Sequence, residues 1–239
     1  DVLVVIAAAG AGSRFGGEVP KALFELAGRT LLHHAISTAA TTRGVVAVVV
    51  AAPVDHLEQV RELCAQLLAT AESRLLFVAG GSNRTTSVAC ALRAAHDAEL
   101  GYSIVLVHDV ARALAPVVLF DRVADAVRSG HAAVVPVLPI VDTVRRVDAS
   151  GGIVETLDRS MLRAIQTPQG FHAEVLHAAH ERIAQVSGNR DNTEFAVTDD
   201  AGLVEHLGYT PHTVPGEPGA MKITRRHDAL FAESLLRNL

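Results

Sequence analysis

The feature that most constrains the fold of this chain is a series of short apolar segments, rich in valine, that show no alternation with polar residues. A segment of this kind is typical of a strand that is covered on both faces. Stretches with apolar residues at helical spacing lie between these segments. Alternating strands and helices predict an α/β fold, with a mostly parallel sheet and helices on both of its sides. The expected strands are Val2–Ala8, Val45–Ala52, Leu75–Ala79, Ile104–Val107 and Ala132–Val137.

The expected helices carry apolar residues three or four positions apart, as a helix with one buried face requires. Ligands of open α/β sheets bind beyond the carboxyl ends of the strands. The loops between each strand and the following helix are therefore the first places to look for a site. The expected helices are Thr30–Ala40, Asp55–Leu68, Ser87–Ala95 and Val117–Val127.

Composition narrows the class of protein further. The chain has 239 residues, of which 49% are hydrophobic, and we expect one domain over residues 1–239. A net charge of −5 argues against a dedicated nucleic-acid binder. Apolar runs all fall short of the ~20 residues of a membrane span, and Asp1-Val2-Leu3 starts a strand rather than a leader peptide. With Cys64 and Cys90 interpreted as small buried hydrophobes in a reducing compartment, we expect a cytoplasmic protein.

One stretch departs from the alternation of strands and helices. Residues 142–160, DTVRRVDASGGIVETLDRS, predict two short strands around a turn at 148–152. The stretch has little apolar content, so it cannot easily be buried in its own domain. We expect residues 139–165 to form a projecting β-hairpin arm. From the residues alone, this arm is either a solvated flap or an extension into a second subunit.

The C-terminal third contains two further expected elements. Residues 197–208 predict a helix with Thr198 as N-cap, Asp199 and Asp200 in its first turn, and Gly208 at its end. Residues 221–239 predict a short strand followed by a helix.

The stretch AAAGAGSRFGGEVPKAL, residues 7–23, predicts a phosphate cradle after the first strand. Its glycines permit close backbone approach, and Arg14 and Lys21 supply positive charge. The dinucleotide-binding pattern fails because Phe15 occupies the third glycine position, and the P-loop pattern fails because Glu18 follows Gly17. What remains is a loop suited to a triphosphate attacked at its α-phosphorus, with pyrophosphate leaving. The alternative is a glycine-rich surface turn with solvated cations.

Two later strand ends carry further candidates. In AGGSNRTTSVACAL, residues 79–92, glycines let the backbone approach a flat ligand and Ser87 adds a hydroxyl group. Asp109 ends the strand before VAR, where a carboxylate suits a metal ion or a ribose; the alternative is a helix cap or a partner for Arg112. We interpret His108 as a packed or capping residue. His177 and His180 are three positions apart, but the residues around them complete no convincing zinc set.

Taken in order, several motifs resemble the 2-C-methyl-D-erythritol 4-phosphate cytidylyltransferase family, the CTP-dependent enzymes of the non-mevalonate isoprenoid pathway. The resemblance covers essentially the whole chain, and the ordered set is more specific than any one motif. It implies a Rossmann-like, three-layer fold of the nucleotide-diphospho-sugar transferase type, a Mg²⁺ cofactor and a homodimer joined through the 139–165 arm. The motifs are AAAGAGSRFGGEVPKAL, VAGGSNRTTSV, VHDVARAL, VDTVRR, TPQGF, VTDDAGLVE and MKITRRHDAL.

The resemblance also implies roles for individual residues. Arg14, Lys21 and Lys222 match the catalytic cations, and Asp109 matches the ribose and magnesium region. Thr143 and Arg159 match the methylerythritol phosphate site across the dimer interface, Arg145 matches it less well, and Thr167 lies near it. The roles of Asp199 and Asp200 are not separated. The nucleotide-binding matches are Ala8, Ala9, Gly10, Ala11 and Gly12 for the cradle, and Gly81, Asn83 and Ser87 for the base.

Two motifs differ from the family pattern. HDVARA has Val110 and Ala113 where a small residue and a proline are common, so the loop after Asp109 is expected to be less rigid. The segment GGSNR has no acidic residue, which changes the field beside the base.

The expected reaction is transfer of CMP from CTP to 2-C-methyl-D-erythritol 4-phosphate, by in-line attack of the substrate phosphate. Three alternatives stay open from the residues. They are a cytidylyltransferase for another polyol phosphate such as ribitol 5-phosphate, a sugar-nucleotide pyrophosphorylase, and a CTP-binding module without catalysis.

Overall fold

Strand β1 (Val2–Ala7) lies inside the main sheet and pairs in parallel with β4 (Val45–Ala52) and β6 (Ile104–Asp109). Strand β5 (Arg74–Ala79) continues the parallel part beyond β4. Side chains of β1 alternate between two hydrophobic cores, with Val4 in one and Val5 in the other. The apolar segments are thus strands covered on both faces, as predicted. The computed structural model describes residues 1–10, 15, 19–64, 67, 73–187 and 198–237.

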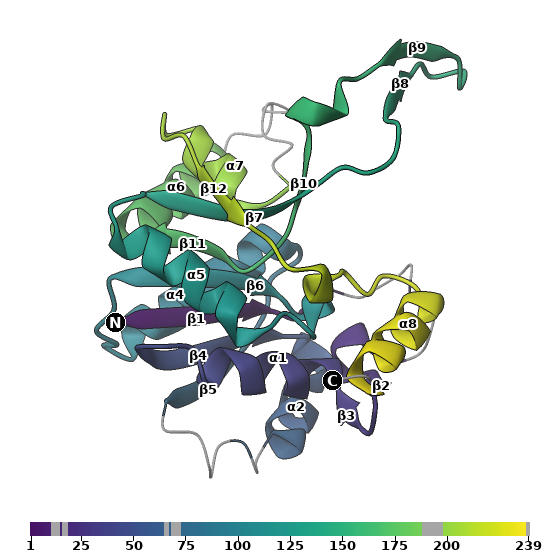
Figure 1. Cartoon of the computed structure of the whole chain (residues 1–239). Helices are drawn as coiled ribbons and strands as arrows, with labels where there is room; N and C mark the ends of the chain where they lie inside the picture. The colour runs from purple at the N-terminus through teal and green to yellow at the C-terminus, as the bar shows by residue number, and fades with distance from the viewer. Residues whose placement is uncertain (11–14, 16–18, 65–66, 68–72, 188–197, 238–239) are drawn as a thin grey trace.

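The other half of the sheet is mixed. Strand β11 (Gln169–His172) runs antiparallel between β6 and β7 (Ala133–Pro139), and β10 (Arg163–Ile165) pairs antiparallel with the C-terminal part of β7. Strand β12 (His212–Pro215) pairs in parallel with β7. The strand order is β10-β7-β11-β6-β1-β4-β5, and the short strands β2 (Glu25–Leu26) and β3 (Arg29–Thr30) pair separately (Figure 1).

Helices cover both faces of this sheet, which confirms the predicted three layers. Helices α1 (Leu31–Ala40) and α5 (Val117–Arg128) pack on one face, with α2 (Leu57–Leu63) and α8 (Arg226–Arg237) contributing to the same core. Helices α4 (Arg84–Asp97), α6 (Ala173–Ser187) and α7 (Asp200–Glu205) pack on the other. Among the described residues, none of the helices combines the length and apolar character needed to cross a membrane.

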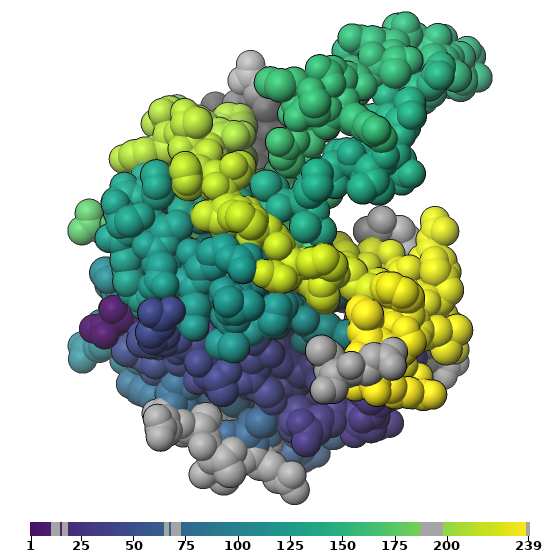
Figure 2. Space-filling view, viewed as in Figure 1, coloured from purple at the N-terminus to yellow at the C-terminus, as the bar shows by residue number. Residues whose placement is uncertain are grey.

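The predicted hairpin is present and projects from the body of the molecule (Figures 1 and 2). Strands β8 (Arg145–Val147) and β9 (Ile153–Thr156) pair antiparallel, and their residues are exposed. The turn between them is stabilised by Asp148, whose Oδ1 accepts hydrogen bonds from the backbone N–H groups of Ser150 and Gly152, at 2.9 and 2.8 Å. Near the base of the hairpin, Arg159 donates a hydrogen bond to the carbonyl oxygen of Val141 and ties the two legs together.

Several predicted element ends need correction. The N-cap of α7 is Asp199, not Thr198, because the Asp199 carboxylate accepts the backbone N–H of Gly202 at 3.0 Å. Helix α4 begins at Arg84 rather than Ser87, since Asn83 and Thr86 form a reciprocal capping box. Helix α2 begins at Leu57, after a 3-10 turn over Val54–His56; of the expected helix 55–68, residues 65, 66 and 68 lie outside the described part.

The prediction of a short strand at the start of residues 221–239 is wrong. Ile223 is fully buried, which gives the segment its strand-like pattern, but its backbone N–H donates to the carbonyl of Ala111 at 2.8 Å instead of joining a sheet. The segment is therefore held by contacts with the loop after β6.

Candidate active site

A cavity of about 440 Å³ opens where β1, β5 and β6 end, as expected for an open α/β sheet. The loop after β1 contributes Ala9 and Gly10, the loop after β5 contributes Gly81 to Asn83, helix α4 contributes Arg84, and β6 contributes Asp109. Lys21 and Lys222 complete the lining from two distant parts of the chain. The sequence contains only these two lysines, and both line the cavity.

Close packing brings the loops after β1 and β5 together. A Cβ atom on Gly80 would lie 2.2 Å from the Cβ of Ala9, so only glycine fits there. The Ser87 hydroxyl accepts the backbone N–H of Gly81 at 3.1 Å and donates to the carbonyl of Asn83 at 2.7 Å. Ser87 therefore shapes the loop that lines the cavity. The predicted residue Ala8 is buried under this wall rather than exposed to the cavity.

Lys21 is hydrogen-bonded to the residue that follows Lys222. Lys21 Nζ donates to the carbonyl oxygen of Ile223 at 2.9 Å, 202 residues away in sequence. Lys222 Nζ lies 2.8 Å from Oδ2 of Asp109. Of the three cations predicted to converge, these two do so; Arg14, together with Ala11 and Gly12, lies outside the described residues.

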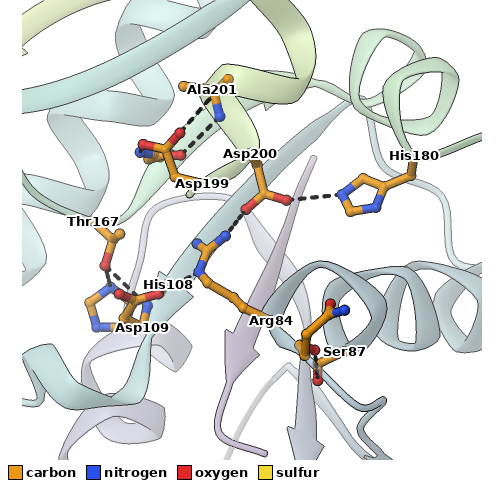
Figure 3. Close-up of polar contacts among 12 residues, drawn as sticks. Arg84, Ser87, His108, Asp109, Thr167, His180, Asp199, Asp200 and Ala201 are labelled. Atoms are coloured by element: carbon orange, nitrogen blue, oxygen red, sulfur yellow. Dashed lines mark hydrogen bonds and ion pairs between the residues drawn. The ribbon is translucent and has the colours of Figure 1, made fainter. Parts of the chain in front are cut away.

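Arg84 joins the cavity to the interior of the protein (Figure 3). Its Nε donates to Oδ1 of Asp109 at 2.9 Å, and its Nη1 donates to Oδ2 of Asp200. Asp200 is fully buried, and its Oδ1 lies 2.9 Å from Nε2 of the buried His180. The charges therefore alternate from Lys222 through Asp109 and Arg84 to Asp200. Asp109 is bound by Arg84 and Lys222 rather than by Arg112, the partner considered from sequence.

These contacts set the charge state of both carboxyl groups. Burial acts to raise the pKa of Asp109, but the charges and hydrogen bonds of Arg84 and Lys222 outweigh it and hold the pKa well below its usual range. For Asp200, burial is likewise outweighed by Arg84 and His180, so its pKa is lowered. Burial acts to lower the pKa of Arg84, but Asp200 and Asp109 raise it overall. All three groups are therefore charged at neutral pH.

The structure gives the two neighbouring aspartates, Asp199 and Asp200, different roles. Asp199 caps α7, and its Oδ2 accepts a hydrogen bond from Nε2 of Gln169 at 2.7 Å. Asp200 is instead the buried counter-ion of Arg84. Both contacts of Asp200 join segments that are distant in the sequence, which is why the pair could not be assigned beforehand.

Thr167 fixes the backbone of Asp109. Its Oγ1 accepts the Asp109 N–H at 3.0 Å and lies 3.1 Å from Nδ1 of His108. His108 is fully buried and packs against Phe120, as its interpretation as a packed residue predicted. Burial lowers the pKa of His108 to about 4, so its ring is neutral at pH 7. Thr167 itself is buried and lies behind the cavity wall.

The predicted acceptor residues do not line the cavity of this chain. Thr143, Arg145 and Arg159 are exposed on the arm. His177 contacts Tyr102, and within the described residues no group of histidine, cysteine, aspartate and glutamate side chains is arranged to hold a metal ion. Arg84, Asp200 and His180 are the residues that sequence reasoning missed as a unit, although the motif GGSNR contains the first of them.

Comparisons with known proteins agree on one family. The model of the family described as "IspD: 2-C-methyl-D-erythritol 4-phosphate cytidylyltransferase" matches residues 2–238. The 2-C-methyl-D-erythritol 4-phosphate cytidylyltransferase of Frankia casuarinae is 46% identical over 235 residues, which are 98% of this chain and 81% of that protein.

Two solved structures are similar over nearly the whole chain. The enzyme of the same name from Thermus thermophilus is 36% identical, covers 98% of both chains and has a TM-score of 0.73. The 4-diphosphocytidyl-2C-methyl-D-erythritol synthase from Anaerococcus prevotii is 27% identical, with a TM-score of 0.80 over 99% of this chain and 98% of that one.

Proposed function

The chain belongs to the 2-C-methyl-D-erythritol 4-phosphate cytidylyltransferase family, and from this premise we propose how its cavity carries out the CTP-dependent transfer of CMP to 2-C-methyl-D-erythritol 4-phosphate. The family match favours this acceptor over other polyol phosphates such as ribitol 5-phosphate. It equally favours a nucleotidyltransferase over a CTP-binding module without catalysis. The observation that carries the proposal is the convergence of Lys21, Lys222 and Asp109 on one cavity.

The reaction exchanges one phosphorus–oxygen bond for another. An oxygen of the substrate phosphate forms a bond to the α-phosphorus of CTP, and the bond from that phosphorus to the bridging oxygen of the β-phosphate breaks. Pyrophosphate leaves, and 4-diphosphocytidyl-2-C-methyl-D-erythritol is formed. The attacking phosphate is already ionised at pH 7, so the step needs no strong general base. Catalysis then depends on positioning and on neutralising charge.

Lys21 and Lys222 are the described groups that supply this positive charge. Lys222 is 42% exposed at its side chain, whereas its partner Asp109 is 12% exposed, so the lysine is the more accessible of the two groups. We assign Lys222 and Lys21 to the phosphates of CTP, where negative charge grows during the reaction. Arg14 is proposed as the third cation by its place in the glycine loop.

The loops after β1 and β5 are proposed to bind the nucleoside. Ala9 and Gly10 line one wall and Gly81, Asn83 and Ser87 the other. The hydroxyl of Ser87 and the side chain of Asn83 are engaged within their own loop. Backbone groups of this loop are therefore left to recognise the cytosine edge, which combines a donor with acceptors.

We also propose that Mg²⁺ takes part. Asp109 is the one carboxylate among the described lining residues, and Mg²⁺ is commonly held by one or two carboxylates together with substrate phosphates. Each oxygen of Asp109 accepts one hydrogen bond and keeps a second acceptor site. The residues thus fit an ion held mainly by the triphosphate, with Asp109 as its protein ligand. When bound, the ion would neutralise charge on the departing pyrophosphate.

The acceptor is proposed to bind between two copies of the chain. Thr143 and Arg159 lie on an exposed arm that carries the exposed apolar residues Val147, Ile153 and Val154. An arm of this composition fits a partner subunit better than solvent. We therefore propose a homodimer in which each arm supplies Thr143 and Arg159 to the cavity of its partner. A cytoplasmic location is proposed as well; it agrees with two free cysteines, of which Cys64 is buried with its pKa raised by burial to about 11.

A pyrophosphate-release assay tests this function. Methylerythritol phosphate and ribitol 5-phosphate are each combined with CTP, UTP, ATP and GTP, with and without Mg²⁺. We expect turnover with CTP, Mg²⁺ and methylerythritol phosphate at a rate well above every other pair. Binding of CTP without turnover would refute the enzyme, and preference for ribitol 5-phosphate would refute the acceptor.

A further inference from the structure

The segment that carries Lys222 has almost no regular structure of its own. Between β12 and α8 it contains a single 3-10 turn, over Pro218–Ala220. Helices and sheets therefore do not explain why the ammonium group of Lys222 meets Asp109 at 2.8 Å. The position of this lysine has to come from contacts made by other parts of the protein.

After Lys222, Ile223 is held by Ala111, and before it Ala220 accepts a hydrogen bond from Arg112 at 2.7 Å. The stretch that leads up to these contacts is held by a buried glutamine, Gln166. Its Nε2 donates to the carbonyl oxygen of Glu217 at 2.8 Å, and its Oε1 accepts the N–H of the same residue at 2.9 Å. The carboxamide thus pairs with both backbone groups of Glu217, as a neighbouring strand would. A longer contact of 3.4 Å joins Nε2 to the carbonyl of Ala220, two residues before Lys222.

The fit around this side chain is close. A Cβ atom on Gly216 would lie 2.3 Å from Oε1 of Gln166, so the segment can approach only because glycine stands there. The N–H of Gly216 donates to the carbonyl of Val137 at 2.8 Å, and the N–H of Gln166 donates to that of Pro136 at 2.8 Å. The glutamine and the segment it holds are both anchored on β7.

The next residue along the chain acts on the other member of the ion pair. Thr167 accepts the backbone N–H of Asp109 at 3.0 Å, while Gln166 binds the segment of Lys222. Two consecutive residues between β10 and β11 therefore contact both sides of the Asp109–Lys222 pair.

We propose that Gln166 is a positioning residue that sets the place of Lys222 in the cavity. This inference rests on the proposed function, since it assigns Gln166 to the same reaction. Gln166 does not line the cavity and acts through Lys222. Misplacing a charged group by about 1 Å can cost on the order of 100-fold in rate, so a held segment matters for turnover.

Gln169 provides a matched control for the test. It is also a buried glutamine of the same stretch, and its carboxamide makes two contacts, against three for Gln166: to Oδ2 of Asp199 at 2.7 Å and from the N–H of Ala201 at 3.2 Å. Gln166→Leu and Gln169→Leu thus remove similar numbers of buried hydrogen bonds from different segments. Hydrogen exchange followed by mass spectrometry should show faster exchange over 216–222 in Gln166→Leu, and over 199–205 in Gln169→Leu.

Turnover then decides between positioning and simple loss of stability. We expect Gln166→Leu to lower kcat about tenfold or more, with the Kd for CTP changed less than threefold. In a Lys222→Ala background the same substitution should lower kcat less than twofold further, because its effect passes through that lysine. Gln169→Leu should lower kcat by the same factor in both backgrounds.

Three results would overturn the proposal. These are unchanged exchange over 216–222 in Gln166→Leu, an unchanged kcat in that variant, or an equal further loss in the Lys222→Ala background. A wild-type chain that releases no pyrophosphate would refute the proposed function instead. The exchange measurement would then still decide whether Gln166 holds this segment.

Discussion

The ammonium group of Lys222 lies 2.8 Å from the carboxylate of Asp109, although 113 residues separate them in the sequence. The other oxygen of Asp109 is held by Arg84, which is anchored on the buried Asp200. Asp109 is thus fixed from behind, while Lys222 has its exposed side toward the cavity. An incoming triphosphate would meet a lysine whose position is already set.

Lys21→Ala should lower kcat by ~10²-fold or more, because one positive charge at the developing transition state is lost. The KM for CTP should rise only modestly, since other groups still bind the nucleotide. Steady-state pyrophosphate release measures both, and Arg61→Ala serves as a control at an exposed ion pair with Glu58. An unchanged kcat in Lys21→Ala would contradict its assigned role.

Asp200→Asn should lower the free energy of unfolding by about 3 kcal/mol, because it leaves the buried charge of Arg84 without its main partner. Asp199→Asn should cost about 1 kcal/mol, since asparagine is also a good N-cap and only the hydrogen bond from Gln169 is lost. Urea unfolding of the two variants at pH 7.5 makes the comparison. Equal losses of unfolding free energy in the two variants would contradict the role of Asp200 as the main counter-ion of Arg84.

Stability should fall between pH 7 and pH 5, and His108 should account for part of the loss. The pKa of this ring is about 4 in the folded protein and about 6.5 when unfolded, so the unfolded state binds the proton first as the pH falls. His108→Gln should therefore lose about 2 kcal/mol less than the wild type over this range. Asp109 and Asp200 stay ionised here because their pKa values are lowered. Equal pH dependence in the two proteins would contradict a neutral buried His108.

Arg159→Ala should raise the KM for methylerythritol phosphate by about tenfold, the loss expected for one charged hydrogen bond to a phosphate. The KM for CTP should stay within twofold. Arg43→Ala is a control, because Arg43 is exposed and pairs with Asp125 on the body of the molecule. A rise in the KM for CTP with an unchanged acceptor KM would show that the arm does not bind the acceptor.

Strands buried on both faces were the part of the fold easiest to predict from sequence. Every residue of the run Val45–Ala52 is apolar, so both faces of the strand must be buried. Its length and its burial therefore follow from composition alone. The short strands β10, β11 and β12 have three or four residues each, too few to show a pattern. Their pairing with β7 depends on contacts distant in the chain.

In the candidate site too, local sequence patterns predicted some residues, whereas contacts between distant parts of the chain could not be predicted. Asp109, Gly81 and Ser87 could be found because they follow predicted strands, whose carboxyl ends meet at one edge of the sheet. Arg84 and Asp200 meet across 116 residues, and Gln166 meets Glu217 across 51. Sequence spacing carries no signal for such contacts, and only the folded backbone brings them together.

Since this chain has lysine at just two positions and both line the cavity, its side-chain amines are all in one place. Every other permanent cation is an arginine, which does not form imines or acylated amines under mild conditions. Among side chains, a reagent such as an aldehyde-bearing nucleotide analogue, fixed by borohydride, would label only these two lysines. The chain thus comes equipped for site-selective labelling without any engineered residue.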